Sequence, residues 1–335
     1  MTAATPTPPR TTSHLLVTGA AGEVGRRLVA RIAADGHRVR ALVLRGDPLR
    51  ARIADLPVEI CEGDVRERAT LDRAVAGVDT VLHLAAVILA RDPAVLDAVN
   101  RQGTANLVAA AAEAGSVRHF IYVSSASVVY PHLTPYGQSK LAAERIVQGE
   151  ARLRHTIVRP TLVYDENGGQ EFALFRRYLH RFPVVPFVGP TSGPRAARKR
   201  PIHGADVVEA LARMVGNPVT YGRTYNLSGS ETITLADLGK LVLRLEGRSK
   251  PFVALPIAAC RMLASGFAAV MQNPPLTPYA VAGFTNHADL DPSEAVRDLD
   301  WHPRGVREGL AACLRDVGRD PLTRAAALSA DRRSA

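Results

Sequence analysis

Short apolar runs alternate with amphipathic stretches over residues 14–159. Six runs are rich in β-branched residues, as strands buried on both faces of a parallel sheet should be. They are Leu15–Thr18, Val39–Leu44, Val58–Cys61, Thr80–Leu84, His119–Val123 and Thr156–Val158. The spacing predicts helices at Glu23–Ala34, Pro93–Ala114 and Pro135–Gln148, each followed closely by a glycine that serves as a stop signal. This alternation predicts repeated βαβ units and a doubly wound parallel sheet of the α/β class.

After Pro160 the pattern loosens, because eight glycines and prolines fall within residues 168–194. We expect a substrate-side loop region there. Regular spacing returns with helices at Ala205–Val215, Leu235–Leu245 and near Val306–Val317, and a strand at Thr224–Leu227. The predicted organisation is a dinucleotide-binding domain over residues 14–180, completed by 205–246, and a smaller C-terminal substrate-binding subdomain from 181–204 and 247–318. Residues 1–13 and 319–335 are expected to be flexible tails.

The composition is that of an ordinary globular protein, with 47% apolar and 22% charged residues among 335, which excludes disorder as the main state. Three widely spaced cysteines, Cys61, Cys260 and Cys313, argue against a disulfide framework or a cysteine-based metal site, so no metal is expected. Residues 1–13 contain no apolar stretch, so they do not form a secretory signal peptide. A reducing, cytoplasmic location is therefore expected.

An excess of 42 Lys and Arg over 32 Asp and Glu gives a net charge of +10, with the densest basic cluster at residues 195–200. Because no aromatic-interleaved basic stripe accompanies it, we expect a phosphate-bearing small molecule rather than nucleic acid. The most apolar window is Phe252–Met271, which contains Pro256 and a single charge, Arg261. No integral membrane span is expected; one or two buried short helices are favoured over a membrane-surface or apolar-substrate element.

A glycine-rich turn, Thr18-Gly19-Ala20-Ala21-Gly22-Glu23-Val24-Gly25, joins the first predicted strand to the first predicted helix. Glycines there permit a tight turn and a close approach of backbone to a pyrophosphate, and the helix N-terminus offers unpaired N–H groups. This position at the start of a βαβ series predicts a Rossmann-like dinucleotide site. The contacts expected to come from this turn are Gly19, Ala21, Gly22, Glu23, Val24 and Gly25.

The end of the second strand distinguishes NAD from NADP, since an acid there binds ribose hydroxyls and an arginine accepts the 2′-phosphate. The strand ends Val43-Leu44-Arg45-Gly46-Asp47, with no acid at the expected place. Arg45 therefore favours NADP, with NAD as the alternative; the competing interpretation is that Arg45 is solvated and Asp47 caps the next turn. Asp64 and Val65, after the third strand, are candidates for the adenine edge, although Asp64 could equally be a cap.

The fifth strand ends at a serine pair, Ser124 and Ser125, and the next helix opens with Tyr136 and Lys140. Residues four apart lie on one helix face, here toward the carboxyl edge of the sheet where ligands bind. A phenol is a weak base unless a neighbouring ammonium favours its phenolate. We expect Tyr136 and Lys140 to act in hydride chemistry, with Ser125 hydrogen-bonded to the reacting oxygen; a surface tyrosine packed on a lysine stem is the alternative.

Taken in order, these motifs resemble the extended short-chain dehydrogenase/reductases of the NAD(P)-dependent epimerase/dehydratase type, over about residues 14–314. Besides the glycine turn, the serine pair and Tyr136 with Lys140, the matching pieces are His83–Ala86, Asn100–Leu107, Arg159–Tyr164, Arg200–Asp206, Tyr225–Gly229 and Leu299–Pro303. Each piece alone specifies little, whereas the ordered set specifies the family.

The resemblance implies roles for individual residues. Tyr136 would be the acid/base, Lys140 would orient it and hold the nicotinamide ribose, and Ser125, with Ser124 beside it, would contact the substrate. Asn100 would join a proton relay. Leu84, Ala85 and Ala86 would line the cofactor, as would Pro160 and Val163 in a loop beside the nicotinamide. By analogy with sugar-nucleotide members, Lys199 and Arg200 would bind a diphosphate, with a solvated loop as the alternative.

Two features depart from sugar-nucleotide members: Tyr136 follows Ser125 by only 11 residues, and Val129-Tyr130-Pro131 replaces the usual Val-Tyr-Gly. Residues 183–189 and 252–271 are instead similar to branches with steroid-like or flavonoid-like substrates, or to an accessory subunit of respiratory complex I. The first expectation is hydride transfer at a secondary alcohol or ketone of a nucleotide-sugar. The alternatives are a net NADPH-dependent reductase of an apolar substrate and a non-catalytic nucleotide-binding protein. The family also suggests a homodimer.

Overall fold

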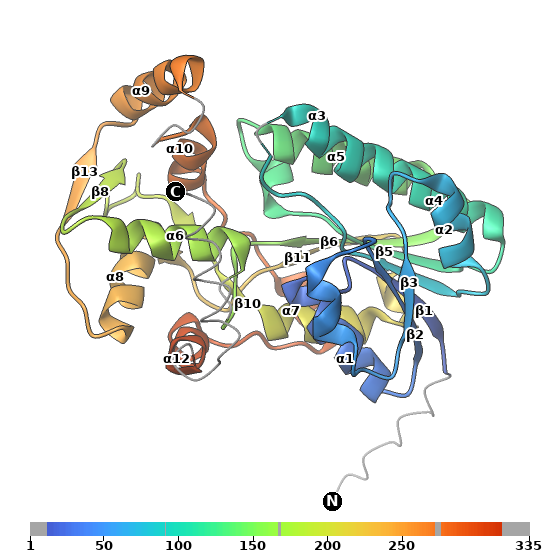
Figure 1. Cartoon of the computed structure of the whole chain (residues 1–335). Coiled ribbons are helices and arrows are strands. Elements are labelled where there is room, and N and C mark those ends of the chain that lie inside the picture. Colours follow the sequence, from blue (N-terminus) through green and yellow to red (C-terminus); the bar gives the residue numbers. More distant parts are fainter. Residues whose placement is uncertain (1–11, 91, 167–168, 272–275, 317–335) are drawn as a thin grey trace, which may run out of the picture.

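A parallel seven-stranded sheet forms the centre of the N-terminal lobe in a computed structural model that describes residues 12–90, 92–166, 169–271 and 276–316 (Figure 1). The strand order is β11-β6-β5-β4-β1-β2-β3, and every neighbouring pair is parallel. The strands are β1 (His14–Thr18), β2 (Arg38–Val43), β3 (Glu59–Glu62), β4 (Thr80–His83), β5 (His119–Val123), β6 (Arg154–Pro160) and β11 (Arg223–Leu227). The order reverses between β1 and β4, so their carboxyl ends flank the crevice where such folds bind ligands.

Helices cover both faces of this sheet, which confirms the predicted doubly wound α/β fold. One face packs on α1 (Glu23–Ala34) and α7 (Gly204–Met214), and the other on α2 (Arg68–Val75), α4 (Gly103–Ala114) and α5 (Pro135–Gly149). A short helix α3 (Pro93–Leu96) and a π-helical segment (Asp97–Gln102) run directly into α4. Three short 3₁₀ helices lie at Pro48–Ile53, Ala126–Val129 and Pro218–Thr220.

A second lobe lies beside the carboxyl edge of the sheet (Figure 1). It contains α6 (Gln170–Arg181), β8 (Val185–Val188), α8 (Leu235–Leu245), β13 (Phe252–Leu255), α9 (Ile257–Val270), α10 (Pro278–Thr285) and α12 (Val306–Asp316). Two small sheets, β7 (Val163–Tyr164) with β10 (Ile202–His203) and β9 (Arg198–Lys199) with β12 (Ile233–Thr234), join the lobes, and α11 (Ser293–Leu299) packs on β11. Buried residues of α6 and α8 belong to this lobe's core, although the predicted domain boundaries place both helices with the nucleotide domain.

Most predicted elements agree with the structure to within a few residues, but the Phe252–Met271 segment does not form buried helices. It folds as strand β13 and helix α9, and only Cys260 and Ala264 of α9 are buried. Pro256 separates the two elements because it cannot donate a ladder hydrogen bond. The expectation of burial was wrong because the segment is apolar on all sides and burial cannot be read from hydrophobicity alone. Helices α2, α6, α10 and α11 were not predicted.

The predicted terminal tails lie outside the described residues, apart from residues 12 and 13. Across the ranges that the structure describes, none of the helices is both long enough and apolar enough to cross a bilayer. The three cysteines are unpaired.

Candidate active site

A cavity of about 370 Å³ opens where the carboxyl ends of the central strands meet the second lobe. Thirteen of the residues that the sequence assigns to the site line it: Gly19, Gly22, Glu23, Val24, Gly25, Leu84, Ala86, Ser124, Ser125, Tyr136, Lys140, Pro160 and Val163. Other residues that line the cavity were not predicted from the sequence, including Thr161, Asp165, Glu171 and Val207. The predicted nucleotide and catalytic ends therefore share one cavity.

The glycine turn has the geometry that a dinucleotide phosphate requires. Gly19 has φ +68°, and a Cβ atom added there would lie 2.8 Å from the Ala85 nitrogen. A Cβ atom on Gly25 would overlap the Gly19 carbonyl oxygen, so only glycine lets α1 approach the turn this closely. Helix α1 begins after Gly22 without a side-chain cap, which leaves its first N–H groups for an anion. These features fit a bound dinucleotide.

A buried polar chain holds the backbone beside this turn. The Thr18 hydroxyl lies 2.7 Å from His83 Nδ1 and accepts a 3.1 Å hydrogen bond from the Ala85 backbone N–H. His83 Nε2 lies 2.9 Å from the Thr104 hydroxyl. Burial, with a smaller effect of Lys140, lowers the pKa of His83 to about 3, so the ring is neutral at physiological pH. The chain fixes the loop formed by Leu84–Ala86 over the cofactor side of the cavity.

Tyr136 and Lys140 project from the first turns of α5 into the cavity. Pro135 stands at the first helical position and the Thr134 hydroxyl caps the helix by accepting from the Gly137 N–H at 3.1 Å. Lys140 is 2% exposed; its Nζ donates a 2.7 Å hydrogen bond to the Val123 carbonyl and lies 4.3 Å from the centre of the Tyr122 ring. Tyr136 and Lys140 therefore lie on one face of α5 and both line the cavity, as their spacing predicted.

Burial governs the acid/base state of both groups. It lowers the pKa of Lys140 to about 7, while the Glu144 carboxylate acts in the opposite direction. Burial raises the pKa of Tyr136 above its usual 10, the Glu171 carboxylate raises it further, and a hydrogen bond with Ser125 lowers it. At neutral pH Tyr136 is therefore protonated, and its phenolate form would need a cation such as Lys140, which lines the same cavity, for stabilisation.

The serine pair presents two hydroxyls at the same end of the cavity. Ser125 caps the Ala126–Val129 3₁₀ helix by accepting from the Ser127 N–H at 3.1 Å, and it also hydrogen-bonds to Tyr136. The Ser124 hydroxyl is buried and has no partner among the residues that the structure describes. A buried hydroxyl without a partner at a cavity wall is suited to a substrate oxygen.

Asn100 does not line the cavity, although the resemblance implies a relay role for it. Its side-chain amide donates to the Ser139 hydroxyl at 3.0 Å and to the Val87 carbonyl at 2.9 Å, and its oxygen accepts from the Val87 N–H at 2.8 Å. Ser139 in turn donates to the Tyr136 carbonyl at 2.8 Å. Asn100 thus braces the helix turn that carries Tyr136, from a π-helical segment of the kind often found at functional sites.

The residues proposed for the adenosine end lie outside the cavity lining. Arg45 is exposed just after β2. Asp47 accepts from the Leu49 N–H at 2.9 Å and caps the following 3₁₀ helix, as one interpretation of the sequence held. Asp64 accepts 2.9 Å and 3.0 Å hydrogen bonds from the backbone N–H and Nε of Arg66, which lowers the pKa of its carboxyl. Val65 is buried against Gly103. Ala21 and Ala85 are near the turn but do not line the cavity.

Lys199 and Arg200 do not reach the cavity lining either. Lys199 is 4% exposed, and its Nζ donates to the Gly283 carbonyl at 3.0 Å and to the Asn286 carbonyl at 2.7 Å, near the end of α10. Arg200 Nε donates to the Thr232 hydroxyl at 2.9 Å. The diphosphate role of both residues stays a prediction, and these contacts do not support it.

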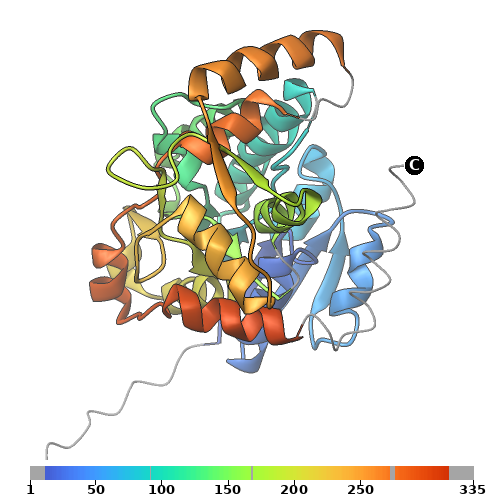
Figure 2. The same cartoon turned by 90° about the vertical axis from the view of Figure 1, so that its left-hand side faces the viewer.

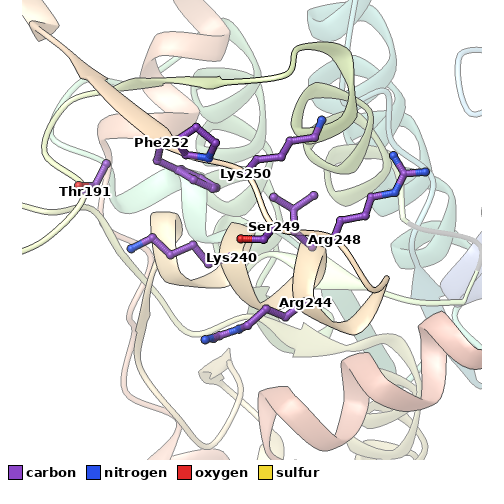
Figure 3. A pocket seen from close by; sticks show the side chains of 9 residues that line it. Thr191, Lys240, Arg244, Arg248, Ser249, Lys250 and Phe252 are labelled. Atoms are coloured by element: carbon purple, nitrogen blue, oxygen red, sulfur yellow. The ribbon is translucent and has the colours of Figure 1, made fainter.

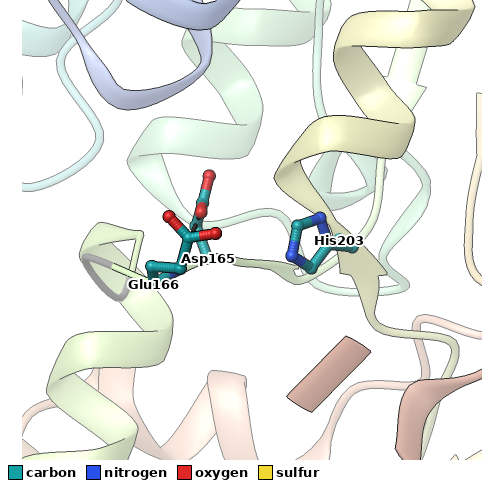
Figure 4. A group of neighbouring side chains, drawn as sticks. All are labelled: Asp165, Glu166 and His203. Atoms are coloured by element: carbon teal, nitrogen blue, oxygen red, sulfur yellow. Dashed lines mark hydrogen bonds between the residues drawn. The ribbon is translucent and has the colours of Figure 1, made fainter. Parts of the chain in front are cut away.

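Asp165, Glu166 and His203 form a cluster at the join between the lobes (Figure 4). Arg27 Nη2 donates 2.6 Å hydrogen bonds to both carboxylates, so a guanidinium already supplies the positive charge. His203 Nδ1 accepts from the Ala205 N–H at 3.0 Å, which places the ring proton on Nε2 and leaves no lone pair there for a cation. The arrangement fits an ion-pair junction between α1 and β7 and does not fit a metal centre.

Comparison with known proteins agrees with this geometry. A family model described as NAD(P)H-binding matches residues 19–178. The chain is 32% identical over 282 residues to a ceramide reductase of Caulobacter vibrioides, covering 83% of this chain and 86% of that protein. The chain belongs to the extended short-chain dehydrogenase/reductase family. It is therefore an NAD(P)-dependent enzyme, as the sequence motifs predicted.

Other family members differ in substrate. A 3β-hydroxysteroid dehydrogenase/Δ5→4-isomerase of Mycobacterium tuberculosis is 29% identical over 340 residues, covering 90% of this chain and 89% of that protein. The solved structure of DesIV, a dTDP-glucose 4,6-dehydratase from Streptomyces venezuelae with NAD bound, has a TM-score of 0.70 at 22% identity, covering 90% and 96% of the two chains. That likeness concerns the fold alone. The family is thus established, and the substrate has to be argued from the site.

Proposed function

We propose that this enzyme carries out net, NADP-dependent interconversion of a ketone and a secondary alcohol on a largely apolar, lipid-like substrate. The observation that supports this most is that Lys199 donates its hydrogen bonds to main-chain carbonyls. The cation that was expected to bind a nucleotide diphosphate therefore does not face the cavity. Two of the relatives reported above are named for a ceramide and for a steroid substrate, both apolar. The nucleotide-sugar substrate expected at first becomes the alternative to be excluded.

In the reducing direction, Tyr136 donates its phenolic proton to the carbonyl oxygen of the substrate. Ser125 and Ser124 hold that oxygen by hydrogen bonds, which become stronger as negative charge develops on it. A nicotinamide cofactor held at the glycine turn by Gly19, Gly22 and Gly25 would supply the hydride to the carbonyl carbon. Lys140, which lines the same cavity, would stabilise the resulting phenolate with its ammonium group. One proton and one hydride added to the ketone give the alcohol.

A substrate panel tests the proposal. The purified chain would be incubated with NADPH and either a long-chain keto-lipid or a ketosteroid, and separately with UDP-glucose and dTDP-glucose. We expect substrate-dependent oxidation of NADPH only with the apolar ketones, with alcohol formed in equal amount. Epimerised or dehydrated sugar nucleotide without net cofactor consumption would support the alternative and contradict the proposal.

A further inference from the structure

Helix α9 exposes several large apolar side chains to solvent. It buries only Cys260 and Ala264, whereas Met262 is 74% exposed, Leu263 53% and Val270 81%. Arg261 is the single charged residue among its 14 residues. A surface helix is normally polar on its outer face, and a contiguous exposed apolar patch marks an interaction site.

The apolar face continues onto the adjoining strand. Val253 and Leu255 of β13 are 50% and 37% exposed, and Met271, directly after α9, is 44% exposed. Figure 2 shows β13 running along this side of the molecule from α8 to α9. We call the outer side of these residues, Val253, Leu255, Met262, Leu263, Val270 and Met271, the α9–β13 surface.

A basic pocket of about 310 Å³ lies at the other end of β13, beside Phe252 (Figure 3). Lys240, Arg244, Arg248 and Lys250 line it. Lys250 is fixed by donating to the Leu179 and Phe182 carbonyls at 2.8 Å and 2.7 Å, and Lys240 pairs with Asp237 at 3.1 Å. Among the described residues neither Arg244 nor Arg248 forms an ion pair, and the Asp237 carboxylate, which pairs with Lys240 and also interacts with Arg244, balances only one of the four positive charges.

We propose that the α9–β13 surface and the basic pocket together dock the enzyme on an anionic lipid bilayer. Exposed apolar side chains enter the headgroup boundary while adjacent lysines and arginines attract anionic phosphates. A second copy of the chain is a poorer occupant, because two such surfaces face to face would bring their basic pockets together. The inference rests on the proposed function, which requires a source of apolar substrate.

The surface is connected to the catalytic cavity through α10. Helix α10 packs against α9, and its Tyr279 hydroxyl donates a hydrogen bond to the Glu171 carboxylate, which lines the cavity. An apolar substrate leaving the bilayer under α9 would therefore enter on the side of Tyr136 where the second lobe closes the cavity.

The test is co-sedimentation of the full chain with phosphatidylcholine vesicles, with and without phosphatidylglycerol. We expect the wild-type enzyme to bind the mixed vesicles and to release at high salt. M262E/L263E should lower the partition coefficient at least about tenfold by placing charge at the interface, and R244Q/R248Q should lower it about tenfold on the anionic vesicles only. The matched control is V219E, since Val219 is 52% exposed but lies outside this surface.

Two results would overturn the inference. One is wild-type binding that does not depend on phosphatidylglycerol or that equals the binding of M262E/L263E. The other is light scattering that shows a wild-type dimer dissociated by M262E/L263E, which would assign the surface to a second copy. Turnover of a short water-soluble ketone should be the same in all these variants. Absence of turnover of the apolar ketones by the wild-type enzyme would refute the proposed function, whereas normal turnover of those ketones without vesicle binding would refute only the docking surface.

Discussion

Glu171, which was not predicted from the sequence, affects the chemistry expected of Tyr136. It reaches the cavity from α6 and accepts a hydrogen bond from Tyr279, and its negative charge adds to burial in raising the pKa of Tyr136. A carboxylate at this place disfavours the phenolate that alcohol oxidation needs as its base. This effect on the pKa of Tyr136 is consistent with the proposed reducing direction, in which Tyr136 donates its proton.

Replacing Glu171 with glutamine should shift the pH dependence of alcohol oxidation. The neutral amide removes one of the causes that raise the pKa of Tyr136, so the acid limb of the kcat/KM profile should move to lower pH and oxidation at neutral pH should rise severalfold. Steady-state rates across pH would measure this. E113Q, which neutralises an exposed carboxylate that does not line the cavity, should leave the profile unchanged. An unshifted profile in E171Q would show that Glu171 does not act on Tyr136.

Arg45 is the residue on which the proposed preference for NADP depends. A charge-assisted hydrogen bond to the 2′-phosphate contributes about 1.5–3 kcal/mol, so R45A should weaken NADP binding by about 10- to 100-fold while NAD binding stays nearly constant. Titration of intrinsic fluorescence with each cofactor would measure the dissociation constants. R38A, at the opposite end of β2, is the matched control. An equal loss for both cofactors would contradict the assignment.

At the scale of elements, a partly buried ion pair fixes α5, the helix that carries Tyr136 and Lys140, to the sheet. Arg159 at the end of β6 donates to Glu144 of α5 through Nε at 2.9 Å and Nη2 at 2.6 Å, and the Glu144 residue is 1% exposed. Glu144 lies one turn beyond Lys140. The pair therefore sets the position of α5 relative to the strand that leads into Pro160 on the cavity wall.

R159M should destabilise the fold by about 3–5 kcal/mol, because it leaves a buried carboxylate without its partner. The double variant R159M/E144M should recover most of that loss, since both charges are then gone. Urea denaturation of the two variants and the wild-type enzyme would measure the free energies of unfolding. If the double variant is no more stable than R159M, the unpaired Glu144 carboxylate is not the cause of the destabilisation in R159M.

The sequence predicted those parts of the site that depend on local structure. The glycine turn, the serine pair and Tyr136 with Lys140 each belong to one strand–helix junction, so strand and helix patterns were enough to place them. Glu171 and Asp165 reach the cavity through packing of the second lobe, and no local pattern distinguishes them from other acids. The same applies to Lys199, whose partners on α10 are more than 80 residues away in sequence.

At the scale of the whole molecule, buried neutral histidines make the fold sensitive to acid. Burial lowers the pKa of His83 to about 3 and that of His119 to about 4, against about 6.5 in an unfolded chain. At pH values between the pKa of about 6.5 in the unfolded chain and the lower pKa in the folded protein, the unfolded chain binds protons at these histidines that the folded protein does not bind. The stability these residues contribute is therefore complete above pH 6.5 and is lost as the pH falls toward 4.

Lowering the pH from 7 to 5 should reduce the free energy of unfolding by about 2 kcal/mol for each of these two histidines. H119Q keeps a polar group near Thr156 but removes the titratable imidazole. The free energy of unfolding of H119Q should therefore fall by about 2 kcal/mol less than that of the wild-type enzyme between pH 7 and pH 5. Urea midpoints at both pH values would show this. H132Q, at an exposed position, should behave like the wild-type enzyme. A pH dependence in H119Q as steep as in the wild type would contradict this account.

The most direct test of the central claim is the turnover of Tyr136→Phe with NADPH and an apolar ketone, measured together with its cofactor affinity. The account predicts that kcat falls by about 10²- to 10⁴-fold, because the proton donor is lost, while the dissociation constant for NADPH changes less than about threefold. Y130F, which removes a neighbouring phenol that does not line the cavity, should keep most of the activity. Turnover in Y136F equal to that of the wild-type enzyme would contradict the assignment of Tyr136 as the catalytic acid.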